Sequence, residues 1–525
     1  MSDLTSDEAR LLEPYLTNLE RPVFALRNLP EVVKGALFSR YSRTEKSLRR
    51  VLLDEFVNAP ELGLAGASAQ PAAGAVATQR AEEFYDRVLV GYGDDSVAEL
   101  ASAHLAVEQV SMLAAKALED SRIGISPLEK STRYVRFDRP GADGRFLYYR
   151  SDELGQPSYE RACDQLFNVY SAAVTPLTDA VRERYPIEPD ESERAWKAAT
   201  RAKALDLLRG LLPAAALTNL GLFGNGRAFE YLLTKLSAND LPECRRLAGE
   251  MHRELSAVIP SFVKRALDER YGAPAAARLR AASSALRDVS PIGGGAAAGP
   301  SVQLIEYDPD AERRVAAAAV FPHSDDPLTE LAAEIDDVDR VLAATVGTRD
   351  NRRQKVPRAF EQATYTFEIV GNFGAYRDLH RHRMLSQDRQ LLGTSLGFDT
   401  PPELAEFGFS NEFVAAVSSA ADAHHELEAA LGPALAQYVV PMAYRLRWYF
   451  RANLREVFHL CELRTQVQGH SDYRWLAQQM FLRVHEVHPR LARFASFVDM
   501  TGGDELARRQ SEKRLDAKLN ALGNR

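Results

Sequence analysis

The chain has 525 residues and a formal net charge of −8, and 46% of its residues are hydrophobic and 26% charged. This composition excludes a disordered chain, because it supplies ample apolar surface for a buried core. The negative net charge argues against a non-specific nucleic-acid binder, which needs a basic face, so no nucleic-acid partner is expected.

The predicted elements are mostly helices, inferred from apolar residues at helical spacing, with fewer strands inferred from alternating patterns. In chain order, the helices are expected over 96–118, 198–212, 228–264 and 412–431. The strands are expected over 132–137, 146–149, 302–307 and 364–369. Many helices with a few strands in each half favour an α+β fold over a regular βαβ alternation.

The location of the protein is predicted from the start of the chain and from its cysteines. The first residues, MSDLTSDEARLLE, have neither the basic region nor the apolar stretch of a signal peptide. No apolar run is long enough to span a bilayer, so no membrane partner is expected. The three cysteines, Cys163, Cys244 and Cys461, form no CxxC pair, and so few thiols suit a reducing compartment. We therefore expect a soluble, cytoplasmic protein.

Two stretches rich in Gly and Ala interrupt the predicted elements. Residues 63–77 are expected to form a surface loop in the first half of the chain. Residues 290–300, SPIGGGAAAGP, lack large apolar side chains and are interpreted as a linker. The linker separates parts of comparable length, which prompts a search for an internal duplication.

Aligned segments on the two sides of the linker support a duplication. The aligned pairs are Pro213 with Pro441, Asn225 with Asn453, Arg227 with Arg455, and Glu99 with Glu361. The spacing from Pro to Asn to Arg is identical in the two segments. We therefore predict an N-terminal repeat over 1–289, the linker 290–300, a C-terminal repeat over 301–503 and a polar tail over 504–525.

The densest group of candidate functional residues is the run 376–386, YRDLHRHRMLS. Guanidinium groups bind phosphate through paired hydrogen bonds, and histidine adds a donor near pH 7. In an acidic protein the run therefore predicts a focused anion site. The alternative is a solvated basic face whose charges are paired with acids.

Two shorter motifs are further candidates. In the loop 126–134, hydroxyl groups, backbone N–H groups and Arg133 could cradle a phosphate, or the loop could simply enter a strand. Asn453 and Arg455 could hold a flat heterocycle or its hydroxyl groups, or could satisfy a helix terminus. No cysteine lies in these motifs, so a thiolate nucleophile is not predicted. The sequence His485-Glu486-Val487-His488 is one residue short of HExxH, and no metal site is predicted.

Together these motifs resemble the signature of the flavin-dependent thymidylate synthases. That signature is Arg-His-Arg, followed at fixed spacing by Ser, Asn and Ser, and closed by Arg-Tyr. The C-terminal repeat supplies its first part as Arg381, His382, Arg383 and Ser386. The N-terminal repeat supplies its second part as Ser126, Glu129, Ser131, Arg133 and Tyr134. Each repeat thus keeps the part of the signature that the other has lost.

The resemblance implies a fold, an activity and an assembly. The fold would be two tandem copies of the family fold, with helices around a small, mainly antiparallel sheet. The activity would be methylation of dUMP to dTMP, with methylenetetrahydrofolate as the carbon donor and NADPH as the reductant of FAD. dUMP and folate are thus the expected small-molecule partners. The chain would form a homodimer that mimics the homotetramer of the family.

Carried over residue by residue, the resemblance assigns three groups of site residues. The expected FAD contacts are Arg381, His382, Arg383, Asn453, Arg455, His459, Asn225 and Arg227. The expected nucleotide contacts are Glu129, Lys130, Ser131, Thr132, Arg133 and Arg209. Arg464 is the expected catalytic residue, because an arginine there would stabilise negative charge that develops on the pyrimidine ring.

The split signature leaves two functions open. If the flavin residues of one repeat face the nucleotide loop of the other, the chain is an active flavin-dependent thymidylate synthase. The alternative is a non-catalytic flavin- or nucleotide-binding paralogue. Three departures favour it: Asp388 and His459 in Asn slots, and Asp378 in a Gln slot. An Asp beside a nucleotide phosphate is repulsive unless an arginine intervenes.

Overall fold

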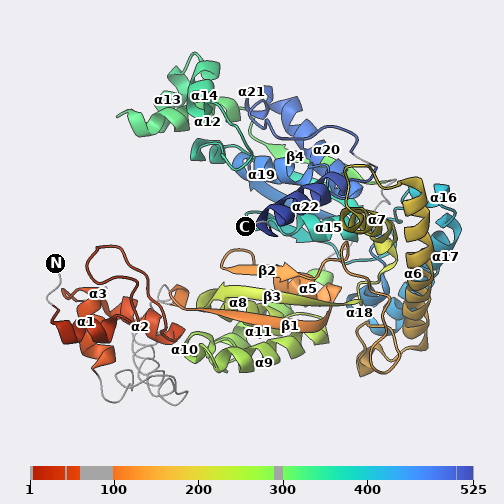
Figure 1. Cartoon of the computed structure of the whole chain (residues 1–525), viewed down its shortest axis with the longest axis horizontal. Coiled ribbons are helices and arrows are strands. Elements are labelled where there is room, and N and C mark those ends of the chain that lie inside the picture. The colour runs from red at the N-terminus through yellow and green to blue at the C-terminus, as the bar shows by residue number, and fades with distance from the viewer. Residues whose placement is uncertain (1–3, 42–43, 59–97, 289–298, 504, 524–525) are drawn as a thin grey trace. The chain divides into compact units, whose positions relative to one another are not determined.

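The computed structural model describes residues 4–41, 44–58, 98–288, 299–503 and 505–523 (Figure 1). The expected loop 63–77 and nearly all of the expected linker 290–300 lie outside these residues. Contacts divide the chain into two compact units. The first unit comprises Met1–Glu108, Ala114–Glu129 and Asn219–Ile292, and the second comprises Gln109–Leu113, Lys130–Thr218 and Gly293–Arg525.

The first unit is built around a three-stranded sheet. Its strands follow the order β1 (Ser102–Ser111), β3 (Leu217–Asn225) and β2 (Ile125–Glu129). Every second residue of β3 is buried, as expected for a strand with one face on the core. The helices that follow β3 in the chain are α8 (Gly226–Ser237), α9 (Pro242–Ser256), α10 (Pro260–Val263) and α11 (Gly272–Asp288).

Shorter helices complete the first unit. They are α1 (Ser6–Leu12), α2 (Glu31–Tyr41), α3 (Leu48–Leu52), the π-helix Leu53–Val57 and most of α5 (Met112–Glu119). Helix α1 begins at a capping box, in which Thr5 and Glu8 each accept a hydrogen bond from the other's backbone N–H. In α8, Phe229, Leu232 and Leu236 recur at helical spacing and are buried, so this face packs on the core.

The second unit is built around a four-stranded antiparallel sheet. Its order is β4 (Ser301–Tyr307), β5 (Thr364–Asn372), β7 (Arg445–Asn453) and β6 (Ser386–Arg389). The central strands β5 and β7 pair along their whole length, from Thr364 opposite Asn453 to Asn372 opposite Arg445. Their buried side chains, which include Tyr365, Phe367 and Ile369, form the middle of the core.

Helices from both halves of the sequence belong to the second unit. The longer ones are α6 (Pro157–Arg184), α7 (Glu193–Leu208), α17 (Ser410–Leu431), α19 (Leu454–Arg464), α20 (Ser471–Val487) and α22 (Arg509–Gly523). The shorter ones include α12 (Ala311–Val320), α13 (Leu328–Glu334), α14 (Val338–Val346), α15 (Phe373–Leu379), α16 (Glu403–Glu406), α18 (Pro433–Ala436) and α21 (Pro489–Ala492). Helices α6 and α7 pack on each other, and α6 also packs on α17. No helix in the described ranges is long and apolar enough to cross a bilayer.

The α+β fold is confirmed, because both sheets are small and antiparallel and helices dominate the rest of each unit. The predicted strands over 302–307 and 364–369 are confirmed as β4 and β5. The predicted helix over 412–431 is confirmed as α17. The helix over 198–212 is confirmed as α7, which passes into a 3₁₀ turn at Arg209–Leu211. The region 228–264 is helical but is divided at Pro242 and Pro260, each of which begins a new helix.

Three sequence-based assignments are wrong. Residues 102–111 of the expected helix 96–118 form strand β1, because they pair with β3, and the helix begins only at Met112. The expected strand 132–137 is a turn, in which the N–H groups of Tyr134 and Val135 donate to the Ser131 carbonyl at 3.3 and 3.1 Å. Within 146–149 only Tyr148 makes a bridge, to Ala216.

Equivalent segments of the two predicted repeats meet within the second unit. Pro213 and Pro441 form an antiparallel bridge, flanked by the hydrogen bonds from Ala214 N to Val440 O at 2.9 Å and from Met442 N to Leu212 O at 2.9 Å. The strand orders β1-β3-β2 and β5-β7-β6 also correspond along the sequence. These parallels support the proposed duplication, whose boundaries stay a prediction.

Candidate functional site

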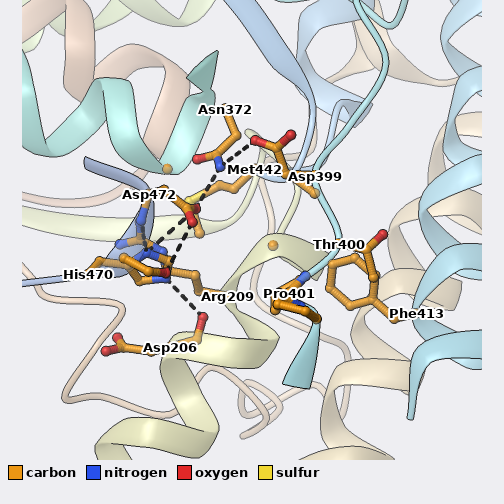
Figure 2. Close-up of a pocket in the computed structure, with 15 residues that line it drawn as sticks. Asp206, Arg209, Asn372, Asp399, Thr400, Pro401, Phe413, Met442, His470 and Asp472 are labelled. Carbon is orange, nitrogen blue, oxygen red and sulfur yellow. Dashed lines mark hydrogen bonds and ion pairs between the residues drawn. The ribbon is translucent and has the colours of Figure 1, made fainter. Parts of the chain in front are cut away.

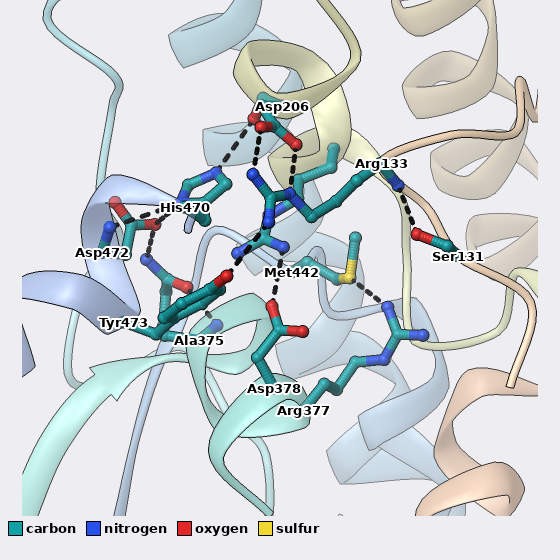
Figure 3. Close-up of polar contacts among 12 residues, drawn as sticks. Ser131, Arg133, Asp206, Ala375, Arg377, Asp378, Met442, His470, Asp472 and Tyr473 are labelled. Atoms are coloured by element: carbon teal, nitrogen blue, oxygen red, sulfur yellow. Dashed lines mark hydrogen bonds and ion pairs between the residues drawn. The ribbon is translucent and has the colours of Figure 1, made fainter. Parts of the chain in front are cut away.

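Charged side chains converge in the second unit around the end of helix α7 (Figure 3). Asp206 lies in the last turn of α7, and Arg209 begins the 3₁₀ turn that follows. Asp378 lies on α15, the helix that begins where β5 ends, and Arg464 is the last residue of α19. We call the following residues the arginine cluster: Arg133, Arg209, Arg381 and Arg464, with the acids Asp206 and Asp378.

Arg133 is held by several partners at once (Figure 3). Its Nε and Nη2 donate to the two carboxylate oxygens of Asp206 at 2.7 and 2.6 Å. Its Nη1 donates to the Tyr473 hydroxyl at 3.0 Å and its Nη2 also donates to the Gln468 carbonyl at 3.3 Å. Burial disfavours the charged form of both side chains, but the attraction between Arg133 and Asp206 is larger than this effect of burial. The pKa of Arg133 is therefore raised, and the pKa of Asp206 is lowered to about 2. The pair therefore stays ionised at neutral pH.

Arg209 has a buried side chain with an unused donor. Its Nη1 donates to Asp378 at 3.0 Å, and only 4% of the residue is exposed. Among the described residues, its Nη2 has no hydrogen-bond acceptor. A Cβ atom at Gly374 would lie 3.2 Å from this Nη2, so the glycine leaves space for the guanidinium. A buried, unused donor on a cation is the feature expected of an anion-binding residue.

Asp378 is the carboxylate at which residues of both repeats meet. Burial alone would raise its pKa, but Arg209, Arg381, Arg464 and Arg133 outweigh burial and hold the pKa well below its ordinary value. Arg209 and Arg133 belong to the first predicted repeat, and Arg381 and Arg464 to the second. The charges of the expected nucleotide residue Arg133 and the expected flavin residue Arg381 thus act on the same acid.

A pocket opens beside Arg209 (Figure 2). Its polar wall includes Asp206, Asn372, Asp399, His470 and Asp472, and its apolar wall includes Phe413 and Met442. The Asn372 amide nitrogen donates to Asp399 at 2.9 Å and to Asp472 at 2.6 Å. His470 caps α20 by accepting from the Asp472 N–H at 3.3 Å, so its Nε2 carries the hydrogen that reaches the Asp206 carbonyl at 3.2 Å. Burial and the nearby Arg209 lower the pKa of His470 and keep it neutral.

A chain of hydrogen bonds fixes Arg464. Its Nε donates to His382 Nε2 at 3.0 Å, so that nitrogen is an acceptor and the hydrogen of the neutral ring lies on Nδ1. Nδ1 in turn lies 2.8 Å from a carboxylate oxygen of Glu456. Burial, together with Arg464 and Lys355, holds the pKa of His382 well below its ordinary value, and burial raises the pKa of Glu456. Arg464 also lies over the Tyr473 ring, with its Cζ 5.7 Å from the ring centroid.

A second pocket lies at the start of helix α19. It is lined by Lys355, Glu361, Met384, Asn453, Arg455, Glu456 and His459. Asn453 caps the helix by accepting from the Glu456 N–H at 3.0 Å. Arg455 donates to the Val356 carbonyl at 2.9 Å and to Glu361 at 3.2 Å. The Lys355 ammonium lies 2.7 Å from His459 Nδ1, which leaves the Nε2–H of that ring as a donor.

His382, Glu456 and His459 place atoms that could bind a metal within 4.8 Å of one another. Both nitrogens of His382 are already hydrogen-bonded, to Glu456 and to Arg464. Nδ1 of His459 faces the positive charge of Lys355. Because a divalent cation would meet two neighbouring positive charges, we interpret these residues as a hydrogen-bonded chain that orients Arg464.

The pH dependence of stability is expected to report on His459. Burial and Lys355 lower its pKa to about 4, although Glu456 opposes them, whereas an unfolded histidine titrates near 6.5. The stability that His459 contributes is therefore complete above pH 6.5, the pKa of an unfolded histidine. It declines as the pH falls from there toward 4. In urea unfolding between about pH 7 and pH 5, His459→Asn should show a shallower decline than the wild type. His323→Asn, at an exposed histidine, is the matched control, and equal slopes for His459→Asn and the wild type would contradict the prediction.

Three predicted site residues lie in the first unit and have structural partners there. Glu129 accepts from the buried Lys116 ammonium at 3.1 Å. Asn225 caps α8 by accepting from the Ala228 N–H at 2.8 Å, and Arg227 pairs with Glu99 at 2.8 Å on the surface. The Asn-x-Arg motif therefore makes the same local contacts in both repeats: its Asn caps a helix, and its Arg pairs with the aligned acid.

The other predicted residues lie near the arginine cluster along the chain but differ in burial. Thr132 is buried, and Ser131 accepts from the Arg133 N–H at 3.3 Å. Lys130 lies over the Phe137 ring, with its Nζ 4.9 Å from the centroid. Arg383 is exposed. Their contacts with a ligand stay predictions.

Several residues of the site were not predicted from the sequence. They are Asp206, His470, Tyr473, Lys355 and Glu456. One signal was available for Asp206, because an acid stands three residues before Arg209 within the otherwise apolar stretch 204–208. Lys355 and Tyr473 carry no such signal, because their partners, His459 and Arg133, lie 104 and 340 residues away in the chain.

The sequence matches the family described as thymidylate synthase complementing protein over residues 50–261 and 303–490. The chain belongs to this family, that of the flavin-dependent thymidylate synthases. The matched segments come from both halves of the sequence, as the resemblance of the signature to this family leads one to expect.

Curated relatives match nearly the whole chain. A UPF0159 protein of Chlamydia muridarum is 44% identical over 98% of this chain and 99% of its own length. The UPF0159 protein Ta1429 of Thermoplasma acidophilum is 34% identical over 93% of this chain and 99% of its own. Among solved structures, the UMP/dUMP methylase PolB of Streptomyces cacaoi overlaps 39% of this chain and 98% of its own, with 18% identity and a TM-score of 0.31.

Proposed function

We propose that the chain is a flavin-dependent thymidylate synthase that methylates dUMP to dTMP. One observation carries the proposal. Arg209 of the first predicted repeat donates to Asp378 of the second at 3.0 Å, and the charges of Arg133, Arg381 and Arg464 from the two repeats act on the same carboxylate. The two parts of a signature that is split along the sequence therefore contribute to one cluster, which is what a single working site requires.

The nucleotide is proposed to bind at the arginine cluster. In the part of the chain that the structure describes, Nη2 of the buried Arg209 guanidinium has no acceptor, and the pocket beside it has both polar and apolar walls. Such a pocket suits a ligand with an anionic end and a flat ring. Arg464, oriented by His382 and Glu456, is proposed to stabilise negative charge on the pyrimidine ring.

The chemistry of the second pocket fits FAD. Lys355 and Arg455 supply positive charge for a pyrophosphate, and the His459 Nε2–H supplies a donor. Met384 is 53% exposed and offers apolar surface to a ring system. FAD would supply the hydride that converts the transferred carbon into a methyl group. The residues here would bind and orient it, while NADPH reduces it.

The proposed reaction needs no thiol nucleophile. dUMP, methylenetetrahydrofolate, NADPH and a proton give dTMP, tetrahydrofolate and NADP⁺, so the methylene carbon gains one hydride and the pyrimidine C5 loses its proton. The three cysteines are buried, and burial raises the pKa of Cys163 and Cys461 above the ordinary thiol value. A buried, protonated thiol is a poor nucleophile, which supports a route without one.

One observation favours the alternative of a non-catalytic flavin- or nucleotide-binding paralogue. Asp378 stands where the family has a Gln, and its carboxylate already accepts from Arg209 at 3.0 Å. An internal carboxylate that occupies the arginines competes with an anionic ligand for them. The two functions differ in whether methyl transfer follows binding.

The purified chain is expected to bind FAD and to release tritium from dUMP labelled at C5, given methylenetetrahydrofolate and NADPH. It should also rescue a thymidine auxotroph. Omission of methylenetetrahydrofolate is the control, because without its methylene carbon C5 forms no new bond and should not release its tritium. A protein that binds no added FAD would overturn the proposal. A yellow protein that neither releases tritium nor rescues the auxotroph would identify the non-catalytic paralogue.

A further inference from the structure

The C-terminal segment is attached to helix α7 and the loop before it, in the second unit. Arg509 pairs with Glu188 at 2.8 Å and with Glu191 at 3.2 Å. Lys513 pairs with Glu188 and Asp190. One turn further on, Asp516 accepts hydrogen bonds from Ser192, which caps α7, and from Arg194. These contacts hold helix α22 against α7 and the loop before it.

These contacts place Arg508, the residue before α22, against Tyr134 at the end of the loop 126–134. Its guanidinium lies over the Tyr134 ring, with Cζ 4.0 Å from the centroid. Only 7% of Arg508 is exposed. Among the described residues, neither Nε nor Nη1 of this side chain has a hydrogen-bond acceptor. Leaving buried donors of a charged group unused is costly, which indicates that a ligand completes them.

The neighbouring Arg133 differs in this respect. Asp206, Tyr473 and Gln468 already occupy its nitrogens. Arg133 and Arg508 are close enough to repel each other, and Asp206, the acid that faces both, is held in a two-point pair by Arg133. The region around Tyr134 therefore carries more positive charge than Asp206 neutralises. Of the two arginines, Arg508 is the one with described donors that lack an acceptor.

We propose that Arg508 is a binding residue for the phosphate group of the nucleotide, supplied by the C-terminal segment to the loop around Tyr134. The inference rests on the proposed function for the identity of the nucleotide. Residue 508 lies beyond residues 303–490, where the match to the family ends, so the family signature does not include it. Nε and Nη1 lie on different edges of the guanidinium, so each can donate one charge-assisted hydrogen bond to a phosphate oxygen.

The first probe is inorganic phosphate, titrated into the full-length protein and followed by ³¹P line broadening. Arg508→Gln is expected to weaken phosphate binding by about 10- to 100-fold, the loss of a charge-assisted hydrogen bond. Arg508→Lys keeps the charge but loses the fixed direction of the guanidinium donors, so an intermediate loss is expected. Arg514→Gln, at an exposed arginine of the same helix, is the control and should bind as the wild type does.

A second measurement separates this proposal from the proposed function. Equilibrium dialysis with dUMP and with deoxyuridine should show that Arg508→Gln weakens only the phosphorylated ligand. A cooperative thermal transition checks that each variant is folded, and phosphate should raise the unfolding temperature less for Arg508→Gln than for the wild type and Arg514→Gln. Wild-type phosphate affinity in Arg508→Gln, or no phosphate binding by the wild type, would overturn the inference. Phosphate binding that Arg508→Gln weakens, without any dUMP binding, would support the anion site and refute the proposed substrate.

Discussion

Arg464→Gln is expected to lower the rate of dTMP formation by about 100- to 1000-fold, with little change in dUMP affinity. The guanidinium lies within the arginine cluster, and His382 accepts a hydrogen bond from its Nε at 3.0 Å. A donor aimed at charge that develops on the pyrimidine acts on the transition state more than on the ground state. Steady-state kinetics with saturating FAD would separate kcat from KM.

The matched control for Arg464 is Arg483→Gln on the neighbouring helix α20. Arg483 is surface-exposed and pairs with Glu486 three residues on, so its loss should leave the rate unchanged. If Arg464→Gln keeps wild-type kcat, Arg464 does not stabilise the transition state. If it raises KM alone, Arg464 contributes only to binding.

Asp206→Ala is expected to destabilise the protein by about 3–5 kcal/mol, because it leaves the buried guanidinium of Arg133 without its counter-ion. Only 9% of the Arg133 side chain and 16% of the Asp206 side chain are exposed. The pKa of about 2 for Asp206 adds a pH signature. The stability that ionised Asp206 contributes is complete above the ordinary pKa of Asp, 3.8, and is lost as the pH falls toward 2. Urea unfolding at neutral and acidic pH measures both effects.

Two variants make the test of the Arg133–Asp206 pair specific. Asp179→Ala removes an exposed acid that pairs with Arg182 on α6, and should change stability by less than about 1 kcal/mol. The double variant Arg133→Met/Asp206→Leu removes both charges and should recover most of the lost stability, since it leaves no unpaired buried charge. A single variant as stable as the wild type would show that solvent or another acid compensates Arg133.

Local sequence patterns were sufficient where a segment's own residues determine its structure. The alternation over 364–369 predicted β5, because every second side chain there faces the core of a sheet. The aligned Asn225 and Asn453 occupy equivalent helix caps, and the aligned acids Glu99 and Glu361 pair with equivalent arginines. Spacing along the chain predicts the caps, because each Asn accepts from an N–H three residues later. The two ion pairs join residues 128 and 94 positions apart, so only the alignment of the repeats relates them.

Local patterns failed where a distant partner decides the outcome. The alternation over 132–137 predicted a strand, yet the chain turns there, and Arg133 pairs with Asp206, 73 residues away in the sequence. Likewise, residues 102–111 carry helix-compatible spacing but pair with β3. Tertiary pairing overrides local preference at both places.

By itself, the sequence determined the family, the α+β class and the division of one signature between two halves, because each depends on residue types at fixed spacing. Only the tertiary structure decided which of those residues meet. It placed Asp378 under the charge of four arginines from both halves and occupied the donors of Arg133. Within the described ranges it left Nη2 of Arg209 and Nε and Nη1 of Arg508 without an acceptor. The physical reason is that buried charges and donors find their partners across the packed core. There, residues that are close in space can be far apart in the sequence, as Arg133 and Tyr473 are.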